Sequence, residues 1–271
     1  MFTKITFKNK EILAKDPNTP PNILEKLSHD ENLWIKETIA SNPSTPLEIL
    51  EKLANIKKDG EYIRAAVASN PSTPQNILIK LSDDKKWEVR MQVVRNPFTP
   101  IDILEKLSND EEANVRAYVA SIPNVPVNLL ETLANDEDEE VRTEVASNPK
   151  TPVSILEKLA DDKDEFVRQN VVENPNVIDR ILEKLSKDKN IWVREKVARN
   201  LSTPVEVLVK LSNDKSYRVR AGVANNPNTP QKVLDKLSED KEELVRDAVA
   251  NNPKFFRDDH IQPNKSISPS M

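Results

Sequence analysis

Apolar residues recur at helical spacing in the segment IDILEKL, residues 101–107. At about 100° per residue, Ile103, Leu104 and Leu107 fall on one face, while Glu105 and Lys106 point away from it. The pattern predicts a short helix that buries an apolar stripe and exposes its charges.

The residues before this segment predict where the helix begins. Thr99 precedes Pro100; Thr is a good N-cap, and Pro suits the first helical position. Other copies carry a Glu three residues after the Thr, which predicts capping boxes: Thr45 with Glu48, and Thr203 with Glu206.

A second helix is predicted after Asp110, a plausible N-cap that acidic residues follow. We expect it to end at an Asn-Pro step, because Asn tolerates the left-handed cap conformation and Pro cannot extend a helix. Val115, Val119 and Ala120 share one arc, and Arg116 falls inside it.

Both helices recur along the chain. Aligned on the Pro after Asn, successive copies are offset by 26, 28 and then seven times 26 residues, with Leu201 in place of one Pro. The Arg keeps the same period at Arg64, Arg90, Arg116, Arg142, Arg168, Arg194, Arg220 and Arg246, with Lys36 in the first copy. Two markers in one register indicate a tandem repeat.

The predicted organisation is an all-α solenoid of nine 26-residue, two-helix repeats at residues 18–253. Residues 1–17 form an N-terminal cap, and residues 254–271 a C-terminal cap, with Phe255 and Phe256 over the last core, and a disordered tail. The second repeat carries an insertion near residues 55–59, which predicts a longer surface loop. Irregular copies hold Ile122 for Asn, Val125 for Thr and Val177-Ile178 for Thr-Pro.

The pattern VRxxVAxNPxTPxxxLxxL resembles the leucine-rich repeat variant family. The resemblance implies a right-handed solenoid in which an α-helix alternates with a second short helix, often 3₁₀. The period of 26 is longer than the family's and leaves room for a fully α second helix, so α/α and α/3₁₀ repeats both stay open. Some members carry a four-Cys iron–sulfur segment, but this chain has no Cys, so no cofactor is carried over. HEAT-like and armadillo-like repeats are the neighbouring interpretation.

Charge and composition narrow the function classes. The net charge is −5, and every repeat mixes Lys and Arg with acids, which weighs against a nucleic-acid-binding face. The first ten residues lack an apolar signal region and no later stretch resembles a membrane span, so the sequence predicts a cytoplasmic protein with no membrane partner.

Residues suited to catalysis or metal binding are scarce. His29 and His260 are the only histidines, and two glycines cannot form a phosphate-binding loop. The acidic run at residues 136–140 lacks the Gly-turn spacing of a calcium loop. We therefore expect no catalytic, cofactor-binding or metal-binding residues, and no enzyme.

The repeated Arg is predicted to be structural. A guanidinium on a buried arc is costly unless it is paired, so each Arg should bond a carboxylate or a helix-terminal carbonyl of its own or the adjoining repeat. Asp110 and Asp136 are candidate partners.

Candidate partner-binding residues are aromatic and point away from the buried arc. Four of them stand two residues before the Arg or its equivalent: Trp34, Tyr62, Phe166 and Trp192. Tyr118 occupies another outward position. Binding surfaces are enriched in such residues, although packing over a neighbouring repeat is an equal alternative.

Two function classes follow. The first is a non-enzymatic scaffold that binds a protein, a peptide or a second copy of the chain along its surface. The second is a nucleic-acid-binding repeat protein of the DNA glycosylase type, which requires a basic groove that this composition does not supply. A salt-dependent gel shift with duplex DNA separates them.

Overall fold

The computed structural model describes residues 6–255, and all regular structure in that range is α-helical. The helices are α1 (Phe7–Lys15), α2 (Pro21–Ser28), α3 (Leu33–Ser41), α4 (Leu47–Leu53), α5 (Glu61–Ser69), α6 (Gln75–Leu81), α7 (Trp87–Arg95), α8 (Ile101–Leu107), α9 (Ala113–Ser121), α10 (Val127–Leu133), α11 (Glu139–Ser147), α12 (Val153–Leu159), α13 (Glu165–Glu173), α14 (Asp179–Leu185), α15 (Ile191–Arg199), α16 (Val205–Leu211), α17 (Tyr217–Asn225), α18 (Gln231–Leu237) and α19 (Glu243–Ala250).

Each repeat pairs a shorter even-numbered helix with a longer odd-numbered one, and both are α-helices. The predicted apolar stripes are buried: Ile103, Leu104 and Leu107 on α8, and Val115 and Val119 on α9. The all-α repeat fold is confirmed, and the choice left open for the second helix is settled in favour of α.

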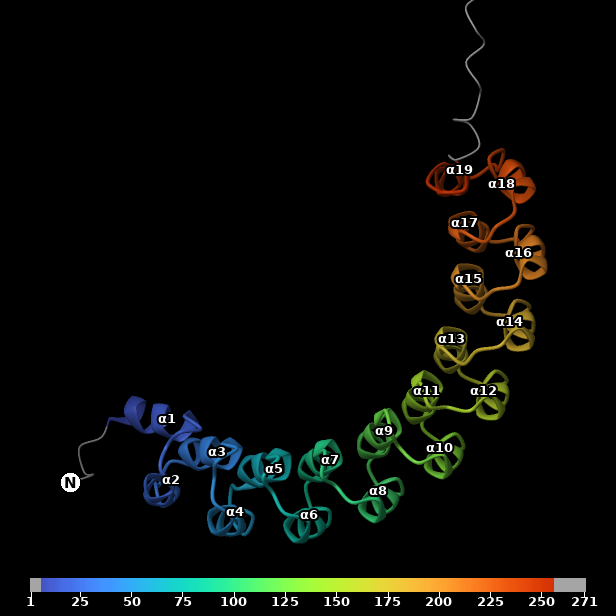
Figure 1. Ribbon diagram of the computed structural model, residues 1–271. Helices are drawn as coiled ribbons and strands as arrows, with labels where there is room; N and C mark the ends of the chain where they lie inside the picture. The colour runs from blue at the N-terminus through green and yellow to red at the C-terminus, as the bar shows by residue number, and fades with distance from the viewer. Residues whose placement is uncertain (1–5, 256–271) are drawn as a thin grey trace, which may run out of the picture. The chain divides into compact units, whose positions relative to one another are not determined.

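The chain divides into two compact units, residues 1–144 and 145–271, and the division falls inside α11. In the first unit, α3, α5, α7 and α9 contact one another in sequence and form one row. The even-numbered helices form a second row beside it (Figure 1). The repeats of this unit therefore stack in register as two layers.

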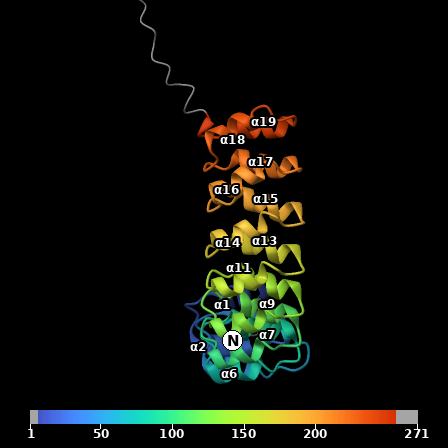
Figure 2. The ribbon, with the colours of Figure 1, turned by 90° about the vertical axis from the view of Figure 1, so that its right-hand side faces the viewer.

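The second unit has the same construction. Its α13, α15, α17 and α19 contact one another in sequence, and α14, α16 and α18 each contact the helix before or after them. Seen from the side, the odd-numbered helices lie one above another with similar directions (Figure 2). One face of each odd-numbered helix therefore stays available on the surface of its row.

The predicted Thr caps are wrong. Pro100, not Thr99, is the N-cap of α8, and it makes no side-chain cap bond. Thr99 instead donates its hydroxyl to the Val93 carbonyl of α7. The capping boxes fail for the same reason, because Thr45 and Thr203 donate to the carbonyls of Ile39 and Val197, at 2.6 Å each. The hydroxyl satisfies the end of the preceding helix rather than the start of the next.

The predicted Asp110 cap is displaced by two residues. The N-cap of α9 is Glu112, while the Asp110 carboxylate accepts the Glu112 backbone N–H at 2.9 Å. Asp110 thus folds the turn that leads into the helix.

The Asn of the Asn-Pro step is not left-handed. Asn96 has φ −71° and ψ 124°, an extended conformation, and the only positive φ outside Gly in the described residues belongs to Asp59. Asp59 lies in the predicted insertion loop between α4 and α5, where the Ile56 carbonyl accepts a bond from Arg64.

At the C-terminal end, Phe255 is partly buried and donates its backbone N–H to the Asn252 carbonyl. Phe256, His260 and the rest of the predicted tail lie outside the described residues, as do residues 1–5 of the predicted N-terminal cap. The division into cap, nine repeats and tail stays a prediction. Between residues 6 and 255, none of the helices has the length and apolar character that crossing a membrane requires.

Candidate functional site

A ladder of arginine–aspartate pairs joins successive repeats. Each Arg bonds through Nε and Nη2 to the carboxylate of an Asp 20 residues later, with Nε–Oδ2 distances of 2.5–2.7 Å. The pairs of this Arg–Asp ladder are Arg64–Asp84, Arg90–Asp110, Arg116–Asp136, Arg168–Asp188, Arg194–Asp214 and Arg220–Asp240.

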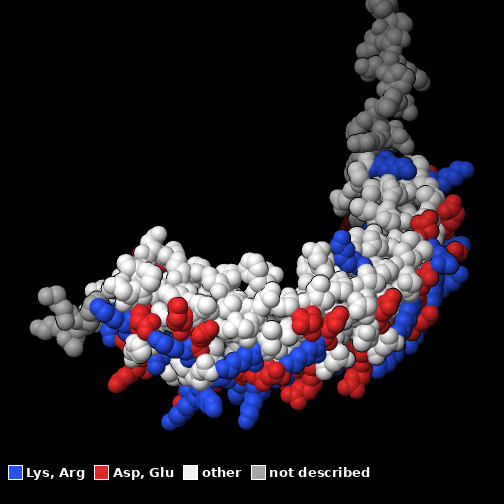
Figure 3. All heavy atoms as spheres, turned by 60° about the horizontal axis from the view of Figure 1, so that its bottom comes forward, with Lys and Arg blue, Asp and Glu red and all other residues white. Residues whose placement is uncertain are grey.

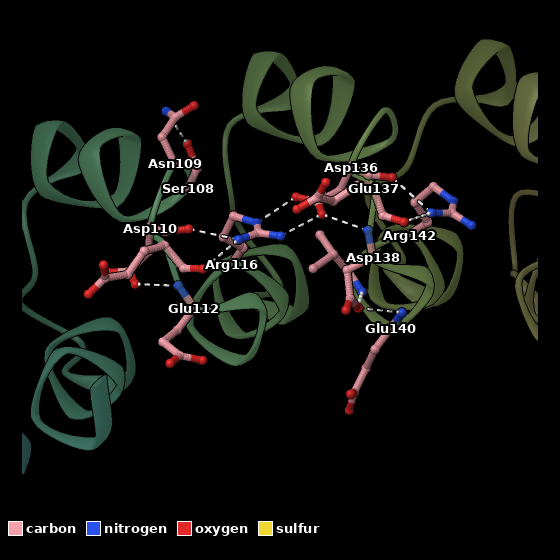
Figure 4. A network of polar contacts seen from close by, with 12 residues as sticks. Ser108, Asn109, Asp110, Glu112, Arg116, Asp136, Glu137, Asp138, Glu140 and Arg142 are labelled. Carbon is pink, nitrogen blue, oxygen red and sulfur yellow. Dashed lines mark hydrogen bonds and ion pairs between the residues drawn. The ribbon is translucent and has the colours of Figure 1, made fainter. Parts of the chain in front are cut away.

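The same guanidinium also closes the turn in its own repeat. Nη1 of Arg116 donates to the Asp110 carbonyl at 2.8 Å, while Nε and Nη2 hold Asp136 of the next repeat (Figure 4). Arg142 donates likewise to the carbonyls of Asp136 and Glu137. Each central Asp therefore receives one Arg on its carboxylate and another on its carbonyl, so neighbouring repeats fix one another.

The ends of the row depart from this pattern. Lys10 occupies the Arg position ahead of the first repeat and pairs with Asp30 at 2.5 Å. Arg246, predicted to be buried, is exposed, because within the described residues no further repeat packs on α19. It bonds the Asp240 carbonyl but no carboxylate of the described residues.

The ladder controls the protonation of its carboxylates. Burial opposes ionisation of Asp84, but hydrogen bonds from Arg64 and the Lys86 backbone outweigh it and hold the pKa of the Asp84 carboxyl below its usual range. The pKa values of Asp136 and Asp214 are lowered by the same balance. For Asp240 the bond from Arg220 is the leading cause of the lowered pKa.

We expect acid to weaken the fold through these groups. The pKa values of these carboxyls in the folded chain lie below the unfolded value of about 3.9. The ladder therefore contributes fully to the free energy of unfolding above that pH, and its contribution is lost as the pH falls through the pKa values of the folded chain. Urea unfolding should give a nearly constant free energy between about pH 5 and 7 and a progressive decrease below about pH 4. An Asp84→Asn variant should lose part of this dependence, and a fold that gained stability on acidification would contradict the assignment.

A second ladder consists of asparagines at the ends of the odd-numbered helices. Asn70 donates its Nδ2 to the carbonyls of Ala40 and Asn42 at 2.6 and 2.8 Å, and its Oδ1 accepts the Ser72 N–H. The members of this Asn ladder whose amides reach back to the preceding repeat are Asn42, Asn70, Asn96, Asn174, Asn200, Asn226 and Asn252. This role of the Asn is not predicted from the sequence, although the Asn repeats at the same period as the paired Arg.

The two ladders fix the backbone that presents the candidate partner-binding residues. On α13, Phe166 is 62% exposed, whereas Val167 and Arg168 beside it are buried. Trp34, Tyr62 and Trp192 are 49%, 68% and 47% exposed at the same position of α3, α5 and α15. We call these four residues the aromatic row. Its members form one pair in each unit, because α3 contacts α5 and α13 contacts α15.

Each Trp of the row forms part of a surface hollow. Trp192 lines a hollow of about 350 Å³ with Glu173, Lys196 and Arg199, and the Arg218 guanidinium lies 4.8 Å from its ring centroid. Trp34 lines a smaller hollow of about 280 Å³ with Lys15, Glu37 and Ser41. Both tryptophans thus lie in a concave setting beside charged side chains of both signs.

Tyr118 differs from the row. It is half-buried on α9, and the Arg95 guanidinium lies over its ring, 5.1 Å from the centroid. Elsewhere on the surface, acidic and basic side chains are interspersed along the side of the even-numbered helices of the first unit (Figure 3). In residues 6–255 no three His, Asp or Glu side chains gather as metal ligands would.

Alternating helices held together by side-chain ladders define an α-helical repeat protein. The family model of the leucine rich repeat variant matches residues 139–164 and 217–242. A solved structure described as a leucine-rich repeat variant with a novel repetitive protein structural motif is 25% identical, with a TM-score of 0.66, over 83% of this chain and 88% of that chain. The resemblance predicted from the sequence is confirmed.

Other matches are more distant. An engineered protein is 18% identical with a TM-score of 0.39, over 90% of this chain and 93% of that chain. A designed armadillo repeat protein in complex with the peptide (KR)4 is 17% identical with a TM-score of 0.19, over 89% and 96%. These low scores support no functional argument. A search of curated proteins gave no match.

Proposed function

We propose that the chain is a non-enzymatic helical-repeat scaffold that binds a protein or peptide partner through its aromatic row. The observation that carries this proposal is the exposure of four aromatic side chains at one position, each beside a residue that is fully or almost fully buried. Large aromatic side chains on a rigid backbone lose little entropy on binding and dominate interface energies.

Different residues join the repeats and form the aromatic row, which supports a role of the row in partner binding rather than in packing. The ladders and the apolar stripes already hold each repeat to the next, and they use none of the row's side chains. Side chains of the row keep about half or more of their surface in water. Exposed aromatic side chains are enriched at interaction sites relative to the rest of a protein surface.

Trp192→Ala is expected to weaken partner binding by about 2 kcal/mol, about 30-fold in Kd, because truncating a central aromatic anchor removes its buried contact area. The melting temperature should stay nearly unchanged, since Trp192 is half exposed. Proteins that immobilised wild-type chain retains from native lysate, and the variant does not, should be purified and their affinities measured by calorimetry.

Phe98→Ala is the matched control, because Phe98 is 59% exposed but lies in the loop between α7 and α8, outside the row. It should bind as the wild type does. A Trp192→Ala chain that melts several degrees lower and binds normally would make the ring a packing residue and refute the proposed site.

A further inference from the structure

The Asn ladder is interrupted at Ile122. Most Asn side chains of the ladder donate to carbonyls 26 and 28 residues earlier. Asn70 reaches 28 and 30 residues back, across the two-residue insertion, and Asn200 makes only the bond over 28 residues. For the position of Ile122 these carbonyls belong to Asn96 and Val94. A hydrocarbon side chain cannot donate to them, so this repeat interface lacks the amide that the others hold.

The two carbonyls are left in different states. That of Asn96 still accepts the Thr99 backbone N–H at 3.1 Å. That of Val94 lies at the end of α7, where a helix leaves its last carbonyls without internal partners. No donor in the described residues bonds to it, whereas the equivalent carbonyls of Ala40 and Ala68 accept an Asn amide at 2.6 and 2.7 Å.

A pocket of about 350 Å³ opens at this place. Its lining includes Val94, Arg95, Tyr118 and Ile122, with Leu104 contributing from α8. Its volume falls within the range of ligand sites, which pair apolar walls with a few placed polar groups. Among the polar side chains of the lining, those of Asn96, Thr99 and Ser121 already donate to backbone carbonyls. The polar groups left for a ligand are an acceptor, the Val94 carbonyl, and a donor, the Arg95 guanidinium that lies over the Tyr118 ring.

We propose that this pocket binds a neutral carboxamide, the side chain of a Gln or Asn in a peptide segment of a protein partner. Its NH2 group donates to the Val94 carbonyl, as a ladder Asn does elsewhere, and its oxygen accepts from Arg95. Its methylene stem packs against Ile122 and the Tyr118 ring. The partner thus supplies the amide donor that the Ile122 side chain lacks.

The chemistry of the lining favours a carboxamide over the other polar and apolar side chains. A carboxylate brings only acceptors and would face the Val94 carbonyl without a proton to share. A Lys or Arg side chain would place its charge beside the Arg95 guanidinium. A hydrocarbon of the same shape leaves the Val94 carbonyl without a partner, which is costly once water is displaced.

The site is separate from the aromatic row, and it rests on the proposed function only in that the carboxamide belongs to a protein partner. A small probe therefore tests the pocket by itself. The probe is N-acetyl-glutamine methylamide, titrated into the full chain while backbone amide shifts are followed by NMR. Saturable shifts should centre on residues 94–96 and 118–122, and N-acetyl-glutamate methylamide should bind at least about tenfold more weakly.

Ile122→Asn should restore the ladder amide, reduce probe affinity at least about tenfold and raise the melting temperature. Ser121→Trp, at an exposed lining position, should block the pocket, and Ser69→Trp, its equivalent in a repeat with an intact ladder, should leave probe binding unchanged. Equal binding of the Gln and Glu probes, no saturable shift, or undiminished binding to Ser121→Trp would each overturn the proposal. None of these results depends on Trp192.

Discussion

Arg168→Ala is expected to lower the free energy of unfolding by about 3 kcal/mol, because it leaves the Asp188 carboxylate buried without its partner. The side chains of Arg168 and Asp188 are 5% and 7% exposed, and Nε lies 2.6 Å from Oδ2. The substitution also frees the Asp162 carbonyl from the Nη1 bond of 2.7 Å. Urea unfolding followed by far-ultraviolet circular dichroism measures the change.

Arg246→Ala is the matched control for this prediction. It removes the same residue type from the same helix position, but Arg246 is exposed and bonds no carboxylate of the described residues. Its effect should be at most about 0.5 kcal/mol, as for an ordinary surface substitution. If both variants lost the same free energy of unfolding, the Arg would stabilise the protein through its own helix rather than through the Arg–Asp ladder.

Asn70→Ala is expected to lower the free energy of unfolding by about 3 kcal/mol, because it leaves the Ala40 carbonyl and the Ser72 N–H without a hydrogen-bond partner and removes one of the two bonds to the Asn42 carbonyl. Asn70 is 1% exposed, and its amide holds Ala40, Asn42 and Ser72. Asn251→Ala, which removes an exposed amide bonded only to the Asp247 carbonyl of its own helix, should change little. A loss below about 1 kcal/mol for Asn70→Ala would show that the buried groups rebond elsewhere.

The sequence predicted what depends on local periodicity. The stripe of Ile103, Leu104 and Leu107 follows from helical spacing alone, and the Arg–Asp pairing follows from the cost of burying a guanidinium at an apolar position. The outward direction of Trp34 and Phe166 follows from the same geometry.

The errors concern polar groups whose partners lie outside their own helix. The sequence predicts caps at Thr99 and Asn96 because capping preferences describe one helix at a time. In the folded chain Thr99 satisfies the preceding helix, and Asn96 donates to Ala68 and Asn70 of the preceding repeat. These partners can be identified only when repeats are placed side by side. For the same reason, the position of Ile122 in the sequence does not by itself show that the Val94 carbonyl lacks an amide donor.

The most direct test of the account compares two variants of one helix, Phe166→Ala and Arg168→Ala. Phe166 is proposed to bind the partner, whereas Arg168 holds the interface between repeats. Partner affinity by calorimetry and unfolding free energy by urea titration, measured on both, should show weaker binding with unchanged stability for Phe166→Ala. Arg168→Ala should show lower stability and near-normal affinity under conditions where it is folded. The reverse pattern, or a Phe166→Ala variant that loses stability and binds normally, would contradict it.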